Sequence, residues 1–140
     1  MTQLPIRNPI YRAFWIFDSY VSSGVFEAFE SEGLMARAEA QGRTIMARMK
    51  AVKAKGKGMP IGDIRGLGAM CAFELVTEHG GNTPDAGAAK ALAAKCLERG
   101  LLILTCGIHS DTIRLLTPLT ASETILNEGL DIIEAAVLGN

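Results

Sequence analysis

The sequence contains few of the residues from which metal and redox sites are built. It has two histidines and three cysteines in 140 residues, and Cys71, Cys96 and Cys106 show no paired spacing. His79 and His109 stand in loop-like stretches without a third ligand at metal spacing. We therefore expect no metal site and no disulfide framework, and we interpret Cys71 and Cys96 as small core residues.

Neither sign of charge is in excess, because 14 basic residues stand against 15 acidic ones. This balance provides no basic surface for nucleic acid and no acidic tail. No uninterrupted apolar stretch approaches the ~20 residues needed to cross a membrane, and the N-terminus lacks the apolar block of a signal peptide. We expect a cytoplasmic protein whose partners are small molecules or proteins, with no nucleic acid and no membrane among them.

Aromatic residues are scarce and unevenly placed. The first 25 residues hold Tyr11, Phe14, Trp15, Phe17 and Tyr20, and Trp15 is the only tryptophan of the chain. We interpret residues 1–25 as a separate aromatic N-terminal segment whose origin no pattern explains. An aromatic stripe on a helix usually packs on a core, and in an isolated domain it would instead cover a face that a missing domain buries.

Residues 26–140 predict one α+β domain, a mainly antiparallel sheet of three or four strands with helices packed on one face. Helical spacing of apolar residues predicts a long helix from Phe26 to about Lys55, bent at Gly33 or Gly42, followed by an exposed loop to Pro60. Residues Ile64 to Val76 are predicted as strand material, in which glycines allow a tight bend.

The second half of the domain alternates helix and strand signals. A helix with Thr83 as N-cap and Pro84 in its first turn should end near Gly100. Continuous apolarity over Leu101 to Thr105 predicts a strand that is buried on both faces or that lies at the centre of the sheet. The short connection to the next strand, Thr112 to Leu116, favours an antiparallel hairpin, and Thr120 with Glu123 forms a capping box for a C-terminal helix.

Arg114 is a cation inside the apolar run of the last strand. An arginine presented from a rigid strand can hold a carboxylate through two parallel hydrogen bonds, which is how proteins commonly fix small acids. The alternative is an ordinary strand arginine that faces water or a structural acid. Arg65, beside Gly66 and Gly68, is interpreted as structural and is assigned no substrate role.

Two stretches resemble one known family. The residues Leu101 to Gly107, followed by Ile113 to Leu119, resemble the C-terminal segment of class III aminotransferases, and in particular that of the 4-aminobutyrate aminotransferase group. Upstream, Ile61 to Met70 is similar to the family's "(D/E)-(I/V)-R-G-x-G-x-(M/L)" strand entry, in the same order and at similar spacing. The resemblance runs from about Phe26 to the C-terminus and covers only the last part of a full-length member.

The resemblance implies a fold, an activity and a site. The fold would be the C-terminal small domain of a fold-type I aminotransferase, and the activity would be transfer of an amino group from an ω-amino acid such as 4-aminobutyrate to 2-oxoglutarate on pyridoxal phosphate, in a homo-oligomer such as a dimer. Arg114 occupies the family position that holds a substrate carboxylate.

The family's cofactor lysine, the acid on the pyridine nitrogen and the phosphate cup belong to a large domain that precedes the matched region. None of the lysines of this chain stands in similar surroundings. We therefore expect no catalytic residue, no cofactor-binding residue and no bound cofactor on this chain alone, which would be an isolated or truncated domain without activity by itself.

Two other classes of function stay open. A stand-alone small α+β module would bind an amino or keto acid with Arg114 as the anchor. An assembly protein would use its aromatic segment to self-associate or to dock onto a partner protein.

Overall fold

The computed structural model describes residues 24, 25, 27 and 29–139. The chain divides into two units, Met1–Met35 and Ala36–Asn140, and each is described by itself. The aromatic residues of the segment 1–25 lie outside the described residues, so the predicted division at residue 25 stays a prediction.

In the first unit, the described residues from Gly24 to Ser31 are helical. The helix is interrupted at Gly33, whose φ of 59° is a left-handed conformation that glycine adopts without strain. The Gly33 N–H donates to the Glu30 carbonyl oxygen at 3.3 Å, as at the end of a helix. The prediction of one continuous helix, bent at Gly33 or Gly42, is therefore wrong, because the helix is interrupted at Gly33 and helix α2 (Leu34–Ala54) begins at the next residue.

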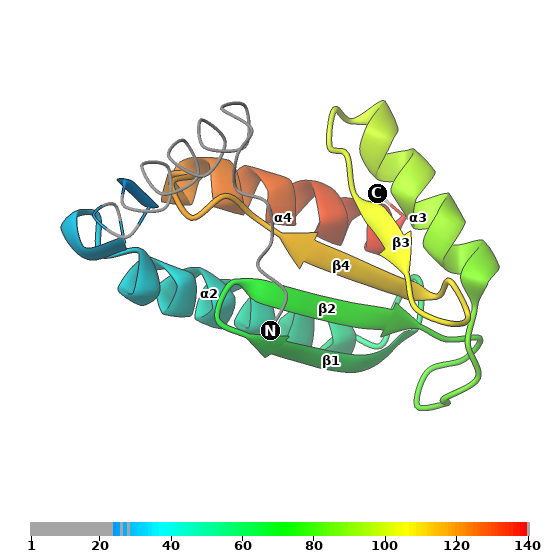
Figure 1. The fold of residues 1–140 in the computed structure, drawn as a ribbon. Coiled ribbons are helices and arrows are strands. Elements are labelled where there is room, and N and C mark those ends of the chain that lie inside the picture. The colour runs from blue at the N-terminus through cyan, green and yellow to red at the C-terminus, as the bar shows by residue number, and fades with distance from the viewer. Residues whose placement is uncertain (1–23, 26, 28, 140) are drawn as a thin grey trace, which may run out of the picture. The chain divides into compact units, whose positions relative to one another are not determined.

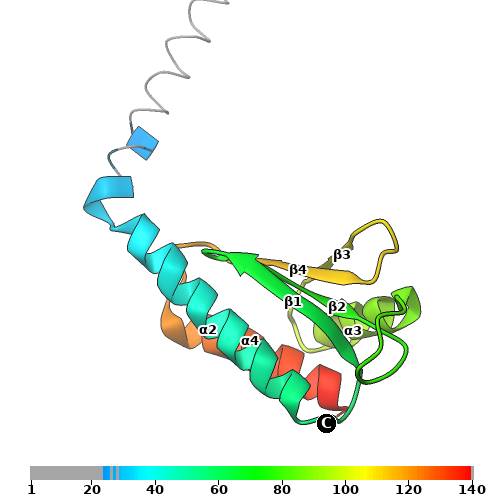
Figure 2. The same cartoon turned by 90° about the horizontal axis from the view of Figure 1, so that it is seen from below.

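The second unit is built on one antiparallel sheet with the strand order β1-β2-β4-β3. The strands are β1 (Ile61–Leu67), β2 (Met70–Leu75), β3 (Leu104–Cys106) and β4 (Thr112–Leu116). Helices α2, α3 (Ala86–Glu98) and α4 (Glu123–Leu138) lie on one side of the sheet (Figures 1 and 2). The predicted α+β fold with helices on one face is therefore confirmed.

The core lies between the sheet and these three helices. Strands β2 and β4 direct alternate side chains toward the helices, and Phe73 and Ile113 are fully buried there. Cys71 and Cys96 belong to the same cluster, as predicted, and burial raises the pKa of both thiols. None of the described helices combines the length and the apolar character required to span a membrane.

The strand material predicted over Ile64 to Val76, with a tight bend at its glycines, is confirmed as two strands rather than one. This stretch is a hairpin, because the chain reverses at Gly68, where φ is 53°, and Leu67 then pairs with Met70. Gly42 is not a bend of α2 but a point of close approach to that turn, since a Cβ atom on Gly42 would lie 2.0 Å from the Gly68 carbonyl oxygen. The two glycines thus let helix and hairpin pack backbone to backbone.

The prediction that Leu101 to Thr105 is a strand buried on both faces or at the centre of the sheet is wrong. Strand β3 is only Leu104–Cys106 and forms an edge of the sheet, and Leu102 and Leu104 are exposed. The hairpin of β3 and β4 is antiparallel as predicted.

Both helix starts differ from the predicted caps. Asp85 caps α3 by accepting from the Ala88 N–H, and Ser122 caps α4 by accepting from the Ile125 N–H. Thr83, the predicted N-cap of α3, is not the cap. Its carbonyl oxygen accepts a hydrogen bond from the Thr77 N–H, which places the segment before α3 beside the end of β2. Each helix therefore begins later than predicted, and the predicted end near Gly100, where φ is 84°, is confirmed.

Candidate functional site

The face of the sheet opposite the helices is formed by side chains that alternate with the core residues. Arg65, Ala72, Arg114 and Leu104 are neighbours across the four strands, in that order. The adjacent row is Leu67, Met70 and Leu116. We call this surface the open face, and define it by the side chains of Asp63, Arg65, Leu67, Met70, Ala72, Glu74, Leu104, Arg114 and Leu116.

Arg65 is engaged in ion pairs on the open face. Its Nη1 atom lies 2.9 Å from Asp63 Oδ2 and also hydrogen-bonds Glu74 Oε1. Hydrogen bonds to Asp63 and then to Glu74 raise the pKa of Arg65. These contacts join β1 to β2, and the structural role predicted for Arg65 is confirmed.

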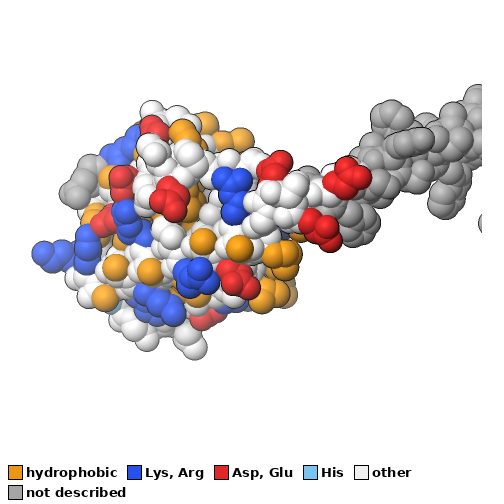
Figure 3. All heavy atoms as spheres, turned by 90° about the vertical axis from the view of Figure 1, so that its left-hand side faces the viewer, with side chains coloured by type: hydrophobic (Ala, Val, Ile, Leu, Met, Phe, Trp, Pro, Cys, Tyr) orange, Lys and Arg blue, Asp and Glu red, His pale blue; other side chains and the backbone are white. Residues whose placement is uncertain are grey.

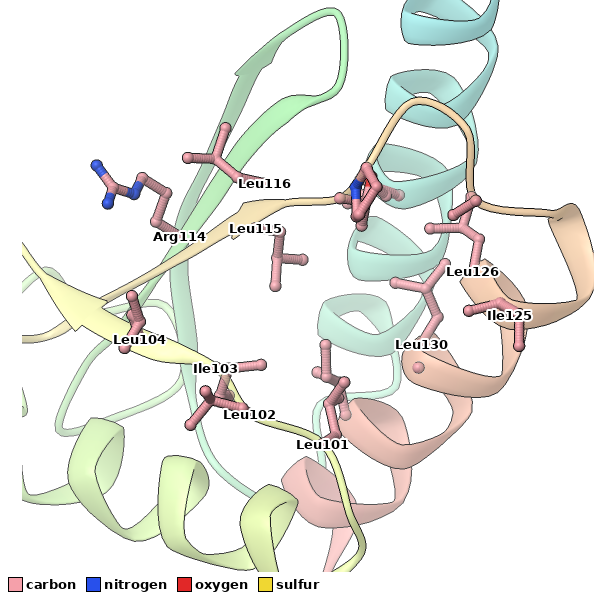
Figure 4. Close-up of a pocket in the computed structure, with 16 residues that line it drawn as sticks. Leu101, Leu102, Ile103, Leu104, Arg114, Leu115, Leu116, Ile125, Leu126 and Leu130 are labelled. Atoms are coloured by element: carbon pink, nitrogen blue, oxygen red, sulfur yellow. The ribbon is translucent and has the colours of Figure 1, made fainter.

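Arg114 lies two strands from Arg65 in the same row and differs from it in its polar contacts. Within the part of the chain that the structure describes, its guanidinium has no hydrogen-bond or ion-pair partner. Figure 4 shows the Arg114 side chain directed away from the helices, while Leu115 next to it points toward them. The N–H groups of the planar guanidinium are therefore available to a carboxylate. The immediate neighbours of Arg114 across the strands, Ala72 and Leu104, are apolar.

A pocket of about 310 Å³ opens beside Arg114 (Figure 4). It exists because β3 pairs with β4 only from Thr112 to Arg114, so that Leu115 and Leu116 have a partner strand on the β2 side alone. Its wall is almost wholly aliphatic and comes from the segment before β3, the end of β4 and helices α2 and α4; it includes Leu101, Ile103, Leu115, Leu126, Leu130 and Ile133. Among the described residues that line it, Arg114 is the one that carries a charge.

Sequence reasoning missed this pocket. The signal was present in Leu101 to Leu104, an apolar run longer than the three residues that pair with β4. A run that extends past its pairing partner leaves apolar side chains at a sheet edge, where they line a hollow rather than fill a core.

A second charged cluster joins the helices and lies apart from the open face. Arg48 on α2 hydrogen-bonds Asp131 and Glu134 of α4, the latter at 3.1 Å, and Lys55 also bonds Glu134. Lys55, and with it Arg48, holds the pKa of Glu134 below its ordinary value against the opposing effect of burial. The cluster ties α2 to α4. On the end of the domain seen in Figure 3, acidic and basic side chains are interspersed.

The described residues do not fit pyridoxal phosphate. The four strands contain no lysine, and no lysine lines the pocket, whereas that cofactor is held as a Schiff base on a lysine. Lys53 and Lys55 are engaged, the first with the Gly62 carbonyl oxygen and the second with Glu134. Among the described residues, no three His, Cys, Asp or Glu side chains gather as metal ligands would.

The fold and sequence define the class of the protein. Residues 17–137 match the family "Aminotransferase class-III". The chain belongs to this family, as the resemblance predicted.

Its relatives are amino acid aminotransferases. The chain is 44% identical over 111 residues to a 5-aminovalerate aminotransferase of Pseudomonas putida, covering 79% of this chain and 25% of that protein. It is 46% identical over 113 residues to a probable 4-aminobutyrate aminotransferase of Bacillus subtilis, covering 81% and 26%. The chain thus spans about a quarter of the length of these curated relatives.

Solved structures contain the same fold. A phospholyase from Arthrobacter in complex with phosphoethanolamine superimposes with a TM-score of 0.72 at 26% identity, over 81% of this chain and 26% of that chain. A lysine aminotransferase from Mycobacterium tuberculosis gives a TM-score of 0.66 at 29% identity, over 81% and 23%. In both, the fold is about a quarter of a larger polypeptide.

Proposed function

We propose that this chain supplies the substrate-carboxylate site of a class III aminotransferase that acts on an ω-amino acid, such as 4-aminobutyrate or 5-aminovalerate, with 2-oxoglutarate as acceptor. The observation that carries the proposal is Arg114, an exposed guanidinium without a partner among the described residues, flanked by apolar side chains. The names of the relatives support the substrate class. 4-Aminobutyrate, 5-aminovalerate and 2-oxoglutarate all carry a carboxylate for this arginine.

Arg114 would orient the substrate and would move no proton. Two parallel N–H···O bonds fix both the position and the plane of a carboxylate, so the reacting end of an extended amino acid is held at a defined distance from the strand. Pyridoxal phosphate, which the family implies, would supply the amino-group transfer. This chain provides no lysine for it, so we assign the chain no step of the cofactor's chemistry.

Three further properties belong to the proposal. The chain alone would be inactive, it would act in a homodimer, and it would be cytoplasmic. The first follows from the missing cofactor residues, and the other two rest on the family.

Inactivity of the isolated chain is tested by adding pyridoxal phosphate to it, reducing with borohydride, and measuring intact mass and peptide maps. We expect no stoichiometric adduct on any one lysine. Specific labelling of a single lysine would mean that the chain holds the cofactor itself and would overturn this part of the proposal.

The role of Arg114 is tested in a chimaera in which residues 26–140 replace the matching quarter of the Pseudomonas putida aminotransferase. Arg114→Lys keeps the charge but loses the planar fork, so kcat/KM for 2-oxoglutarate should fall on the order of a hundredfold through KM. The matched control is Arg65→Lys, in the same row but committed to Asp63 and Glu74. An Arg114→Lys chimaera with KM unchanged would refute the assignment.

The stand-alone binding module makes a different prediction for the free chain. An exposed arginine gains about 0–1 kcal/mol from an ion pair, so the free chain should bind glutarate or 4-aminobutyrate too weakly to saturate at millimolar concentrations. Saturable micromolar binding that Arg114→Ala abolishes would favour the module over the aminotransferase part.

A further inference from the structure

The pocket beside β4 presents almost no polar group to a ligand. Of the described side chains that line it, only Arg114 and Thr117 are polar. The Thr117 hydroxyl is already used, because it donates to Gln41 Oε1 at 2.9 Å. The Gln41 side-chain amide in turn donates to the Pro118 carbonyl oxygen at 3.2 Å. The segment that follows β4 therefore directs these hydrogen-bonding groups toward α2 and leaves the pocket aliphatic.

This interior excludes the polar end of an amino acid. An ammonium group or a second carboxylate placed there would lose its hydration without gaining a hydrogen bond, which is strongly unfavourable. The wall instead has the chemistry of an alkyl chain, since it consists mainly of leucine and isoleucine side chains and no described lining residue is aromatic. 4-Aminobutyrate and 2-oxoglutarate, the substrates proposed above, therefore do not account for the pocket.

The charge of the pocket stands where the pocket meets the open face. Leu104, Arg114 and Leu116 belong to the open face and also line the pocket, whereas Leu126 and Leu130 line it from α4 and belong to the core (Figure 4). A ligand that enters from the open face thus passes a guanidinium before it reaches core residues. Because that guanidinium has no partner among the described residues, the arrangement fits an anionic head followed by an apolar tail.

The volume of the pocket sets the length of the tail. At about 310 Å³ the pocket lies at the lower end of the range for small-molecule sites. A water molecule takes about 30 Å³ of liquid volume and a methylene group is of similar size, so the pocket has room for a chain of about eight to ten carbons.

We propose that this pocket binds a medium-chain fatty acid, a linear monocarboxylate of about eight to ten carbons, with its carboxylate on Arg114 and its alkyl tail against the aliphatic wall. Each methylene group transferred from water to aliphatic surroundings improves affinity about fourfold, so the tail supplies most of the binding. The ion pair with an exposed arginine adds up to about fivefold. The inference goes beyond the proposed function, because it concerns the free chain and needs neither the cofactor nor the rest of an aminotransferase.

A chain-length series tests the site on the free 140-residue protein. Isothermal titration calorimetry with hexanoate, octanoate and decanoate, each below the concentration at which it forms micelles, should show an affinity that rises about tenfold for each two methylene groups. Dodecanoate should gain little over decanoate, because the pocket is then full. Glutarate, whose far end is a second carboxylate, should not saturate the protein. Absence of saturable octanoate and decanoate binding would overturn the proposal, as would an affinity that keeps rising equally steeply to dodecanoate.

The place of the tail is tested by filling the pocket from α4. A Cβ atom on Gly129 would meet Leu101 Cδ1 at 3.7 Å, an ordinary contact, so Gly129→Ala leaves the pocket open. Gly129→Met extends a flexible apolar chain into it. Both variants should melt cooperatively at or above the parent temperature, because glycine is unfavourable inside a helix. Gly129→Met should weaken octanoate binding about tenfold or more and Gly129→Ala only slightly; equal affinities in the two variants would refute this placement of the tail.

The place of the carboxylate is tested with Arg114→Gln and with octanol, which has the same tail but no charge. The substitution should weaken octanoate binding about three- to fivefold and leave octanol binding unchanged. Octanoate binding that is unaffected, or a loss that is equal for both ligands, would overturn the assignment of the carboxylate to Arg114. These outcomes are separate from the proposed function, which is judged by the effect of Arg114→Lys on KM in the chimaera.

Discussion

Both faces of the sheet carry large apolar side chains, but these are buried on one face and exposed on the other. On the covered face, Phe73 and Ile113 have no exposed surface and hold the sheet to the helices. On the open face, Met70 and Leu116, which belong to the same two strands, are more than half exposed. Apolar residues on both faces of one sheet show that packing inside this unit accounts only for those on the covered face. We infer that the exposed ones on the open face serve binding.

The largest expected difference between the faces concerns the free energy of unfolding. Phe73→Ala removes a fully buried ring from the covered face and should cost about 3–5 kcal/mol. Met70→Ala, on the open face of the same strand, should change the stability of the free chain by less than about 0.5 kcal/mol. Urea denaturation of the 140-residue chain measures both values. A Met70→Ala cost close to that of Phe73→Ala would mean that the open face is packed in the free chain.

A second test concerns the backbone contact that holds α2 against the hairpin. Gly42→Ala places a Cβ atom 2.0 Å from the Gly68 carbonyl oxygen, so helix and turn must separate, and we expect a loss of about 1–3 kcal/mol. Gly129→Ala, in α4, meets no such atom and should instead stabilise the chain, by up to about 1 kcal/mol. Thermal melts of the two variants should therefore shift in opposite directions, and a neutral Gly42→Ala would show that the close approach is easily relieved.

The charged cluster on the covered side predicts a pH dependence. The folded-state pKa of Glu134 is lowered, so the stability that its ion pairs contribute is fully present above the ordinary pKa of about 4.5 and is lost as the pH falls through the lowered folded value. Glu134→Gln should cost about 0.5–1 kcal/mol at pH 7, a modest figure because Lys55 and Arg48 remain partly exposed.

Urea denaturation at pH 7 and at pH 3 checks this dependence, because the difference between Glu134→Gln and the parent should shrink at the lower pH. The matched control is Glu39→Gln, whose ion pair with Arg43 is exposed on both sides and should have almost no effect. A difference that stays constant between the two pH values would mean that Glu134 acts by packing rather than by charge.

The sequence predicted the covered face better than the open one, for a physical reason. The helix stripes and the β3–β4 hairpin follow from local periodicity and a short loop, and they were found, as was the structural Arg65. A tight bend at the glycines between β1 and β2 was also predicted, but the packing of Gly68 against Gly42 was not, because it is a contact between segments distant in sequence.

The same reasoning failed at Leu101 to Leu104 because continuous apolarity has two causes. It was interpreted as burial on both faces or a place at the centre of the sheet, whereas Leu102 and Leu104 are exposed beside the pocket. From one sequence, an apolar residue that is buried inside its own domain cannot be told from an apolar residue that lies on the surface and contacts another protein region. Arg114 was identified as a candidate by its apolar setting, and its lack of a partner became visible only in the structure.

The smallest expected effect separates the two arginines of the open face. Arg65→Lys breaks the contacts that one guanidinium makes with Asp63 and Glu74, and because this cluster is half exposed and screened, the cost should be only about 0.5 kcal/mol. Arg114→Lys should leave the stability of the free chain unchanged within error, since no described group depends on it. In denaturation of the free chain, Arg65→Lys should then have the larger effect. In the kinetics of the chimaera, Arg114→Lys should have the larger effect, because Arg65 contributes to stability and Arg114 to substrate binding. Equal stability losses would instead mean that Arg114 is a structural residue, and the carboxylate site would have to be sought elsewhere.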